Sequence, residues 1–104
     1  MTIYKAPFEQ FSVSLDFAAD IGAGNGIASI TAVTAVSSLT GLDSTEEVLA
    51  PSPEPAIANG AGANTAVAFT VQGGVVGERH TVSVQIVSSI GEKYQGDVTL
   101  EIVE

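Results

Sequence analysis

Hydrophobic and polar residues alternate singly along much of the chain, and this pattern predicts β-strands. In the first such stretch every second residue is large and apolar, namely Phe11, Val13, Leu15 and Phe17. A period of two residues is typical of a strand that buries one face, whereas an amphipathic helix repeats every 3.6 residues. We therefore expect a strand over residues 11–17 whose large side chains face the core.

The same alternation predicts a β-hairpin near the C-terminus. Two alternating runs, residues 79–86 and residues 97–102, are separated by a turn at Ser89–Lys93. Because successive side chains of a strand point to opposite faces, each run presents one apolar face that can match the other. The residues expected to point inward are His80, Val82, Val84, Ile86, Val98, Leu100 and Ile102.

Four further segments are expected to be strands. Thr65–Val71 has apolar or small residues on both faces, which favours a central strand. Ile27–Val36 is rich in Ala and Val, and we expect it to be buried on both sides. A Pro-rich middle separates two short candidates, Glu47–Ala50 and Pro55–Ala58, and both are expected at sheet edges because Pro cannot donate to a strand ladder.

The residue types agree with an all-β fold. The chain holds 13 Val, 8 Ile and 9 Thr against 5 Leu, and β-branched residues favour strands. About seven short strands at intervals of roughly 8–12 residues are typical of an immunoglobulin-like domain. We predict an immunoglobulin-like antiparallel β-sandwich of about seven strands, with two sheets face to face and Greek-key connections.

The length of the chain predicts a single domain. Its 104 residues suffice for one domain, which we place at residues 10–104. Residues 1–9 remain open to two interpretations. Pro7 hinders regular pairing while Ile3, Tyr4 and Phe8 offer apolar contacts, which suits an arm that binds a partner. Alternatively this segment supplies the first strand of the domain itself.

Charge and cysteine content narrow the functions. The chain has 12 acidic and 3 basic residues, a net charge of −9 and no cysteine. Nucleic-acid binding depends on clustered Lys and Arg, and anionic bilayers repel an acidic chain, so we expect neither as a partner. Without cysteine there is no disulfide and no thiolate ligand, so packing and hydrogen bonds must stabilise the fold.

A glycine-rich stretch and the acidic residues offer weak ligand-binding motifs. Gly22–Gly26 looks like a phosphate-binding loop, but Ile27 stands where a third glycine would be needed and a strand follows, so we interpret it as a flexible connection. Loop carboxylates could bind Ca²⁺, although solvated loops without a ligand are favoured because the spacing matches no known repeat. The two candidate groups are Asp16, Asp20 and Asn25, and Asp43, Glu46 and Glu47.

The single histidine lacks a partner in the sequence. His80 lies at the inward-facing start of a strand, where sandwich domains often hold a corner tyrosine, and we expect a structural role. No nucleophile or carboxylate pair stands out, so the sequence predicts no catalytic residue, no cofactor and no metal. Sugar stacking would require exposed aromatic rings, for which Tyr4, Phe8 and Tyr94 are available, although core and anchoring roles are favoured.

Several motifs in order along the chain resemble a known family. They are Tyr4–Glu9, the strand end Leu15–Phe17, Ile27–Ile30 after a Gly-rich turn, Val71–Val82 with its Gly-Gly turn, and Ser88–Gly91 before the last strand. In this order they resemble short structural or accessory proteins of tailed bacteriophages that contain an immunoglobulin-like domain. The chain departs from the family pattern in having His80 where an aromatic residue is usual, and in its longer Pro-rich middle.

The resemblance implies a non-enzymatic virion protein that assembles in the bacterial cytoplasm. It would be a capsid decoration or cementing subunit, or a neck or tail accessory subunit, in contact with the major capsid protein or with neck or tail proteins, and it could form a homo-oligomer. Ile3, Tyr4, Pro7 and Phe8 are the residues expected to contact a partner. The alternative function is a free-standing adhesion or glycan-binding module.

Overall fold

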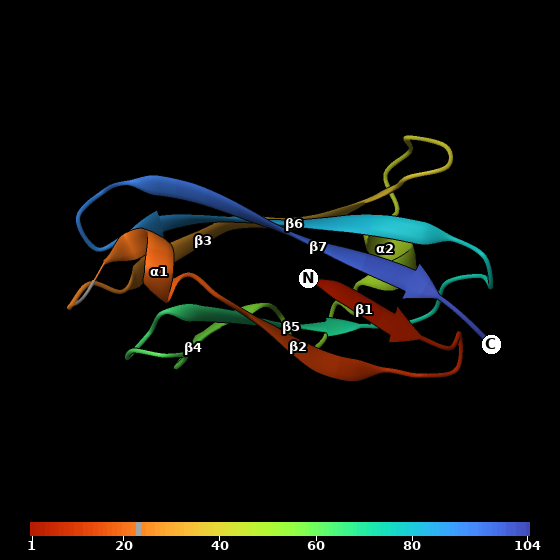
Figure 1. Cartoon of the computed structure of the whole chain (residues 1–104), viewed down its shortest axis with the longest axis horizontal. Helices are drawn as coiled ribbons and strands as arrows, with labels where there is room; N and C mark the ends of the chain where they lie inside the picture. Colours follow the sequence, from red (N-terminus) through yellow and green to blue (C-terminus); the bar gives the residue numbers. More distant parts are fainter. Residues whose placement is uncertain (23) are drawn as a thin grey trace.

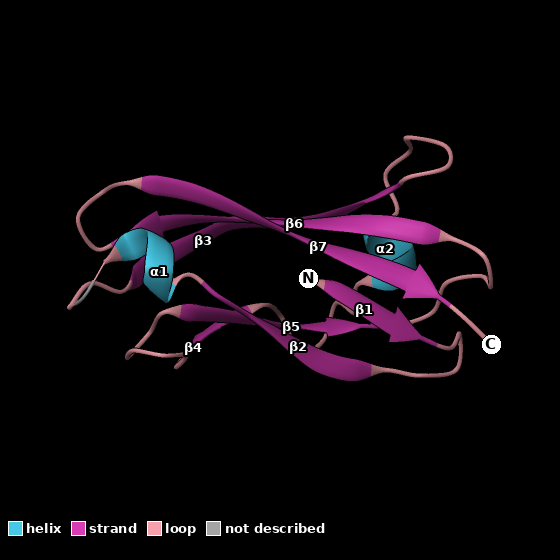
Figure 2. Ribbon diagram, in the orientation of Figure 1, coloured by secondary structure: helices cyan, strands magenta, loops and turns pink. Residues whose placement is uncertain are grey.

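Two β-sheets pack face to face in the computed structural model, which describes residues 1–22 and 24–104 (Figure 1). Most of the regular secondary structure is β-strand, and two short helices lie at opposite ends between the sheets (Figure 2). In chain order the elements are β1 (Thr2–Lys5), β2 (Phe11–Asp16), α1 (Ala18–Ile21), β3 (Ile27–Ser37), α2 (Thr45–Val48), β4 (Ala56–Ala58), β5 (Ala66–Val71), β6 (Arg79–Ser88) and β7 (Lys93–Ile102).

The strand order confirms the predicted immunoglobulin-like sandwich. One sheet has the order β1-β7-β6-β3 and the other β2-β5-β4. Within these sheets β3, β6 and β7 take the places of strands C, F and G of an immunoglobulin domain, and β2, β5 and β4 those of B, E and D. The described strand pairs are antiparallel except that of β1 with β7, which is parallel.

The C-terminal hairpin forms as its alternation predicts. β6 and β7 pair in the register Val82↔Val98, and both valines are buried between the sheets. Leu15 and Phe17 approach from the opposite sheet, where a Cβ on Gly96 would lie 2.8 Å from Leu15 Cδ2. Glycine at position 96 therefore lets the two sheets come close together.

The first predicted strand is only partly as expected. Val13 and Phe17 are buried and Leu15 is half-buried, but Phe11 is 36% exposed because it begins β2 at the open end of the sandwich. β5 is the central strand of its sheet and is buried on both faces, as the pattern of Thr65–Val71 predicts. The predicted edge strand Pro55–Ala58 is present as β4, which pairs with β5 alone.

Two other sequence predictions are wrong. Ile27–Val36 belongs to β3, the edge strand of its sheet, and one face of this strand is largely exposed because the second sheet covers only the inner face. Glu47–Ala50 does not form a strand, since α2 runs through Val48 and Leu49 makes only a single bridge, to Val71 of β5. This helix begins where Asp43 Oδ1 accepts hydrogen bonds from the backbone N–H and the hydroxyl of Thr45, at 2.9 and 2.6 Å.

The N-terminal segment consists of a short strand followed by a turn. Thr2–Lys5 forms β1 and pairs with β7 in the register Ile3↔Leu100. Residues 6–10 then turn around the end of the sandwich and lead into β2 (Figure 1). Deletion of this segment would therefore remove an edge strand from the larger sheet.

Candidate functional site

The four residues predicted to contact a partner do not share one face. Ile3 points inward and packs against the core, whereas Tyr4 is exposed on the outer face of β1. Pro7 and Phe8 lie in the turn after β1, and the ring of Phe8 is 97% exposed. Of the four, Phe8 is the side chain that water surrounds most completely.

Phe8 belongs to a group of exposed apolar side chains at one end of the sandwich. The loops that carry them lie at the end of the sandwich toward which the β1 and β7 arrows point in Figure 1. We call this group the apolar end. Its members are Phe8, Leu39, Leu42, Val75, Val76 and Val103.

Backbone hydrogen bonds connect the segments of the apolar end. The N–H of Val103 donates to Lys5 O at 2.8 Å, and the N–H of Gly77 donates to Ile102 O at 2.9 Å. The N–H of Ser38 donates to Arg79 O at 2.8 Å. The loops are therefore fixed to the sheet rather than free of it.

A buried lysine reinforces these connections. Lys5 has no exposed surface, and its Nζ donates to Ala6 O at 2.8 Å and to Gly73 O. Burial lowers the pKa of this amine, with the charge of Glu9 acting in the opposite direction. The ammonium links β1 to the loop that carries Val75 and Val76.

The most chemically distinctive group surrounds His80, which is fully buried at the start of β6. Its Nδ1 lies 2.8 Å from Ser44 Oγ, and its Nε2 lies 3.2 Å from Glu78 Oε1. The sequence alone shows no partner for this histidine, whereas the structure places a hydroxyl and a carboxylate beside it. Ser44 is 36 residues away along the chain, so spacing alone could not reveal the contact.

Glu47 of α2 joins this group. Ligand atoms of Glu47, Glu78 and His80 all lie within 4.8 Å of one another. The N–H of Val75 donates to Glu78 Oε1 at 2.7 Å, and this bond, together with that to His80, lowers the pKa of Glu78. We call these three residues the Glu-Glu-His cluster.

The contacts of His80 have the members of a hydrolytic triad but not its arrangement. In such triads the nucleophile bonds to Nε2 and the carboxylate to Nδ1, whereas here Ser44 faces Nδ1 and Glu78 faces Nε2. Asp43, Glu46 and Glu47 also line the hollow of about 450 Å³ beside Ser44. Their negative charges would oppose an oxyanion, so the arrangement disfavours acyl transfer.

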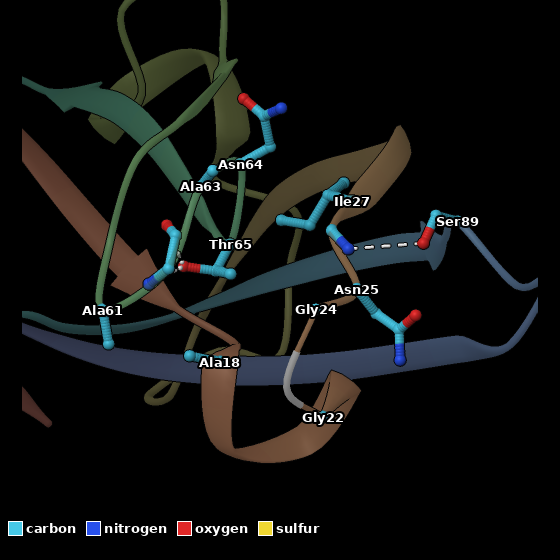
Figure 3. A pocket seen from close by; sticks show the side chains of 12 residues that line it. Ala18, Gly22, Gly24, Asn25, Ile27, Ala61, Ala63, Asn64, Thr65 and Ser89 are labelled. Atoms are coloured by element: carbon cyan, nitrogen blue, oxygen red, sulfur yellow. Dashed lines mark hydrogen bonds between the residues drawn. The ribbon is translucent and has the colours of Figure 1, made fainter.

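Figure 3 shows a hollow at the end of the sandwich opposite the apolar end. It has a volume of about 720 Å³ and is lined largely by Gly and Ala, with Asn25, Asn64, Thr65 and Ser89 as polar side chains. The N–H of Gly26 donates to Ser89 Oγ at 3.3 Å across it. Because its described lining contains neither charged groups nor aromatic rings, the hollow offers little for catalysis or sugar stacking.

The glycine-rich connection at this hollow is followed by a strand, as the sequence predicts, but it is preceded by α1 rather than by a strand. Gly24, Asn25 and Gly26 lead directly into strand β3, so no helix N-terminus is available to a phosphate. Ala23 of the predicted Gly22–Gly26 connection lies outside the described residues.

Two of the carboxylates considered as calcium ligands accept hydrogen bonds from backbone N–H groups of nearby turns. Asp16 accepts from the N–H groups of Ala61 and Ala18, at 2.7 and 2.9 Å, which lowers the pKa of this carboxyl. Asp43 accepts from Thr45, which lowers its pKa as well. Within the described part of the chain, Asp43, Glu46 and Glu47 do not converge as one three-carboxylate group.

A shallow hollow of about 360 Å³ lies beside Tyr94 on the hairpin. Gln85 and Gln95 line it, and Gln85 Nε2 donates to Gln95 Oε1 at 3.0 Å. The hydroxyl of Tyr94 donates to Glu92 at 3.0 Å, and this bond raises the pKa of the phenol. Among the three aromatic residues considered for sugar stacking, Tyr94 is the one beside amide side chains that could bond sugar hydroxyls.

No family model matches the chain, and no curated protein matches it. None of the described helices is long and apolar enough to cross a membrane. Fold and site together define the class of the protein as an immunoglobulin-like β-sandwich domain with an apolar loop end.

Proposed function

We propose that the chain is a non-enzymatic structural protein of a tailed-bacteriophage virion, a capsid decoration or cementing subunit or a neck or tail accessory subunit. The observation that carries the proposal is the apolar end, where Phe8 is 97% exposed among other apolar side chains. Several large apolar side chains exposed at one end of a molecule favour a protein contact there. The phage assignment itself depends on the sequence resemblance.

The energetics of the apolar end favour protein contact. Transfer of one large apolar side chain from water into an interface stabilises a complex by about 1.5–3 kcal/mol. Phe8 and Val75 are anchored by backbone hydrogen bonds of their loops, so binding would order little additional chain. A partner with an apolar recess of its own, such as another virion protein, suits this end.

Quantitative mass spectrometry of purified particles tests the virion assignment. Hundreds of copies per particle would indicate a capsid-covering role, and about 6–12 copies a place at the neck or tail, as expected from the symmetry of closed assemblies. Absence of the chain from particles whose other proteins are detected would refute the proposal.

Variants of exposed residues test the binding surface. Phe8→Ser and Val75→Ser should each reduce sedimentation of the purified chain with particles that lack it. Ile90→Ser is the matched control, because Ile90 is equally apolar and 59% exposed but lies at the opposite end of the hairpin. Equal loss in all three variants, or none, would exclude the apolar end as the contact.

The hollow beside Tyr94 supports a second candidate, a free-standing glycan-binding module. Aromatic rings stack on the apolar faces of sugars, and amide side chains bond their hydroxyls. Titration of the isolated chain against a glycan panel should then give saturable binding that Tyr94→Ala abolishes. A flat titration would leave protein contact as the function.

A further inference from the structure

We propose that Glu47, Glu78 and His80 bind one divalent metal ion of the zinc type. This inference is independent of the virion assignment, because it depends on side chains at the junction of α2, the loop before β6 and β6 itself. The ligand atoms of the three residues lie within 4.8 Å of one another.

The charges around the cluster call for a cation. The chain holds three basic residues, and none is available to Glu47 and Glu78. Lys5 donates to backbone carbonyls, Arg79 pairs with Glu101, and Lys93 begins β7 at the far end of the hairpin. Two neighbouring carboxylates repel each other unless a proton or a cation lies between them.

The imidazole is oriented as a metal ligand. Nδ1 lies 2.8 Å from Ser44 Oγ, and Nε2 lies 3.2 Å from Glu78 Oε1. In the metal-free chain Nε2–H donates to Glu78 and the hydroxyl of Ser44 donates to Nδ1; when a cation displaces the Nε2 proton, Nδ1–H donates to Ser44 and the Nε2 lone pair binds the ion. Metal-binding histidines almost always donate their second N–H in this way, which fixes the tautomer and the ring.

The ligand set and its size select the metal. Zn²⁺ binds imidazole nitrogen and carboxylate oxygen at about 2.0–2.2 Å, so two ligands of one tetrahedral ion lie about 3.4 Å apart. The three ligand atoms lie within 4.8 Å of one another, so metal binding requires the exposed side chain of Glu47 to close a gap of up to about 1.4 Å. Imidazole favours zinc and its neighbours over Ca²⁺ and Mg²⁺, which prefer oxygen alone.

NMR spectroscopy of the single imidazole tests the proposal directly. In long-range ¹H–¹⁵N spectra of the untagged, full-length chain, Zn²⁺ should shift the Nε2 resonance of His80 with 1:1 saturation, while Mg²⁺ should not. Calorimetry should show that Glu47→Gln weakens Zn²⁺ binding by about tenfold or more, the loss typical of changes around a metal site. Glu46→Gln is the matched control, being an exposed acid next to Glu47 on the same helix.

Three results would overturn the proposal. One is an Nε2 resonance that stays in place up to millimolar Zn²⁺. Another is Zn²⁺ binding of equal strength in Glu47→Gln and the native chain. The third is heat of binding without a shift of Nε2, which would place the ion elsewhere. Glu47 is exposed, so its substitution leaves the fold intact and each result can be interpreted.

Discussion

The hydroxyl of Ser44 gives the buried Nδ1 of His80 its partner, at 2.8 Å. Ser44→Ala should therefore lower the free energy of unfolding by about 1–3 kcal/mol, because one buried polar group loses its hydrogen bond. Urea denaturation measures the change. Ser14→Ala, an exposed position on β2, is the control and should change stability little. Equal effects of the two substitutions would contradict the assignment.

Gly73 lies so close to the backbone of α2 that there is no room for a side chain at this position. Its φ is +55°, and a Cβ there would lie 2.6 Å from the carbonyl oxygen of Glu47. We expect Gly73→Ala to cost about 2 kcal/mol or more, since it combines an unfavourable backbone conformation with a clash against backbone.

A substitution at Gly41 serves as the control that separates the cost of backbone conformation at Gly73 from the cost of the clash. The φ of Gly41 is +71°, but a Cβ there would meet nothing within 4 Å. Gly41→Ala should therefore cost about 1 kcal/mol from backbone conformation alone. Thermal unfolding of both variants measures the difference, and equal losses would show that the contact with α2 is unimportant.

The sequence predicts the direction of the His80 side chain but not its partners. Inward orientation follows from the period of two, which is a local property of β6. The contact with Ser44 spans 36 residues and brings the residue before α2 beside the start of β6, which depends on the whole fold. The sequence marks Glu47 as an acidic candidate ligand, but its approach to Glu78 depends on the loop before β6, which the sequence does not reveal.

Elements whose pattern is local were predicted well. The β6–β7 hairpin needs only two alternating runs and a turn, and its inward faces match as expected, although β7 begins at Lys93, before the predicted run 97–102. The Ala- and Val-rich pattern of β3 predicts burial on both faces, but the exposure of its outer face depends on whether another layer covers that side of the sheet. The apolar residues Val48 and Leu49 suggested a strand, whereas Asp43 and Thr45 begin a helix there.

The two interpretations of the N-terminus, a partner-binding arm or the first strand of the domain, predict different effects of deleting β1. Deletion of residues 1–5 should lower the free energy of unfolding by about 2 kcal/mol or more, at about 1 kcal/mol per lost hydrogen bond. The lost bonds include Thr99 N–H to Met1 O, Val103 N–H to Lys5 O and Lys5 Nζ to Gly73 O. Urea denaturation checks this. Unchanged stability would mean that the segment behaves as a dispensable arm.

The end of β2 carries a pH-dependent contact. The N–H groups of Ala61 and Ala18 lower the pKa of Asp16 below its ordinary value of 3.8. A depressed carboxyl pKa stabilises the fold above the unfolded value, and this contribution is lost as the pH falls through the folded pKa. The melting temperature of the native chain should therefore exceed that of Asp16→Asn at pH 7, and the difference should shrink below about pH 4. A difference that stays constant on acidification would contradict this.

At the scale of the whole molecule, the two proposed sites lie at the same end. The loop after Gly73 carries Val75 and Val76 of the apolar end and also Glu78 of the cluster. The backbone N–H of Val75 donates to Glu78, so the position of the apolar side chains depends on that carboxylate. An ion bound to Glu78 would thus hold the proposed contact surface in place.

Net charge governs the stability of the molecule as a whole. The chain carries a charge of −9, and its extents are 41 × 23 × 22 Å. In about 10 mM salt the Debye length is roughly 30 Å, which exceeds the two shorter extents, so most carboxylates repel one another. At about 150 mM it falls to roughly 8 Å, and we expect the melting temperature to rise.

Calorimetric scans at the two salt concentrations measure this rise. The double variant Glu54→Gln and Glu104→Gln removes two exposed negative charges, so its melting temperature should depend less on salt. A native melting temperature that falls with added salt would show that attractive pairs, such as Arg79 with Glu101, outweigh the repulsion. Since that pair is exposed and screened by water and salt, repulsion among the many other carboxylates should dominate.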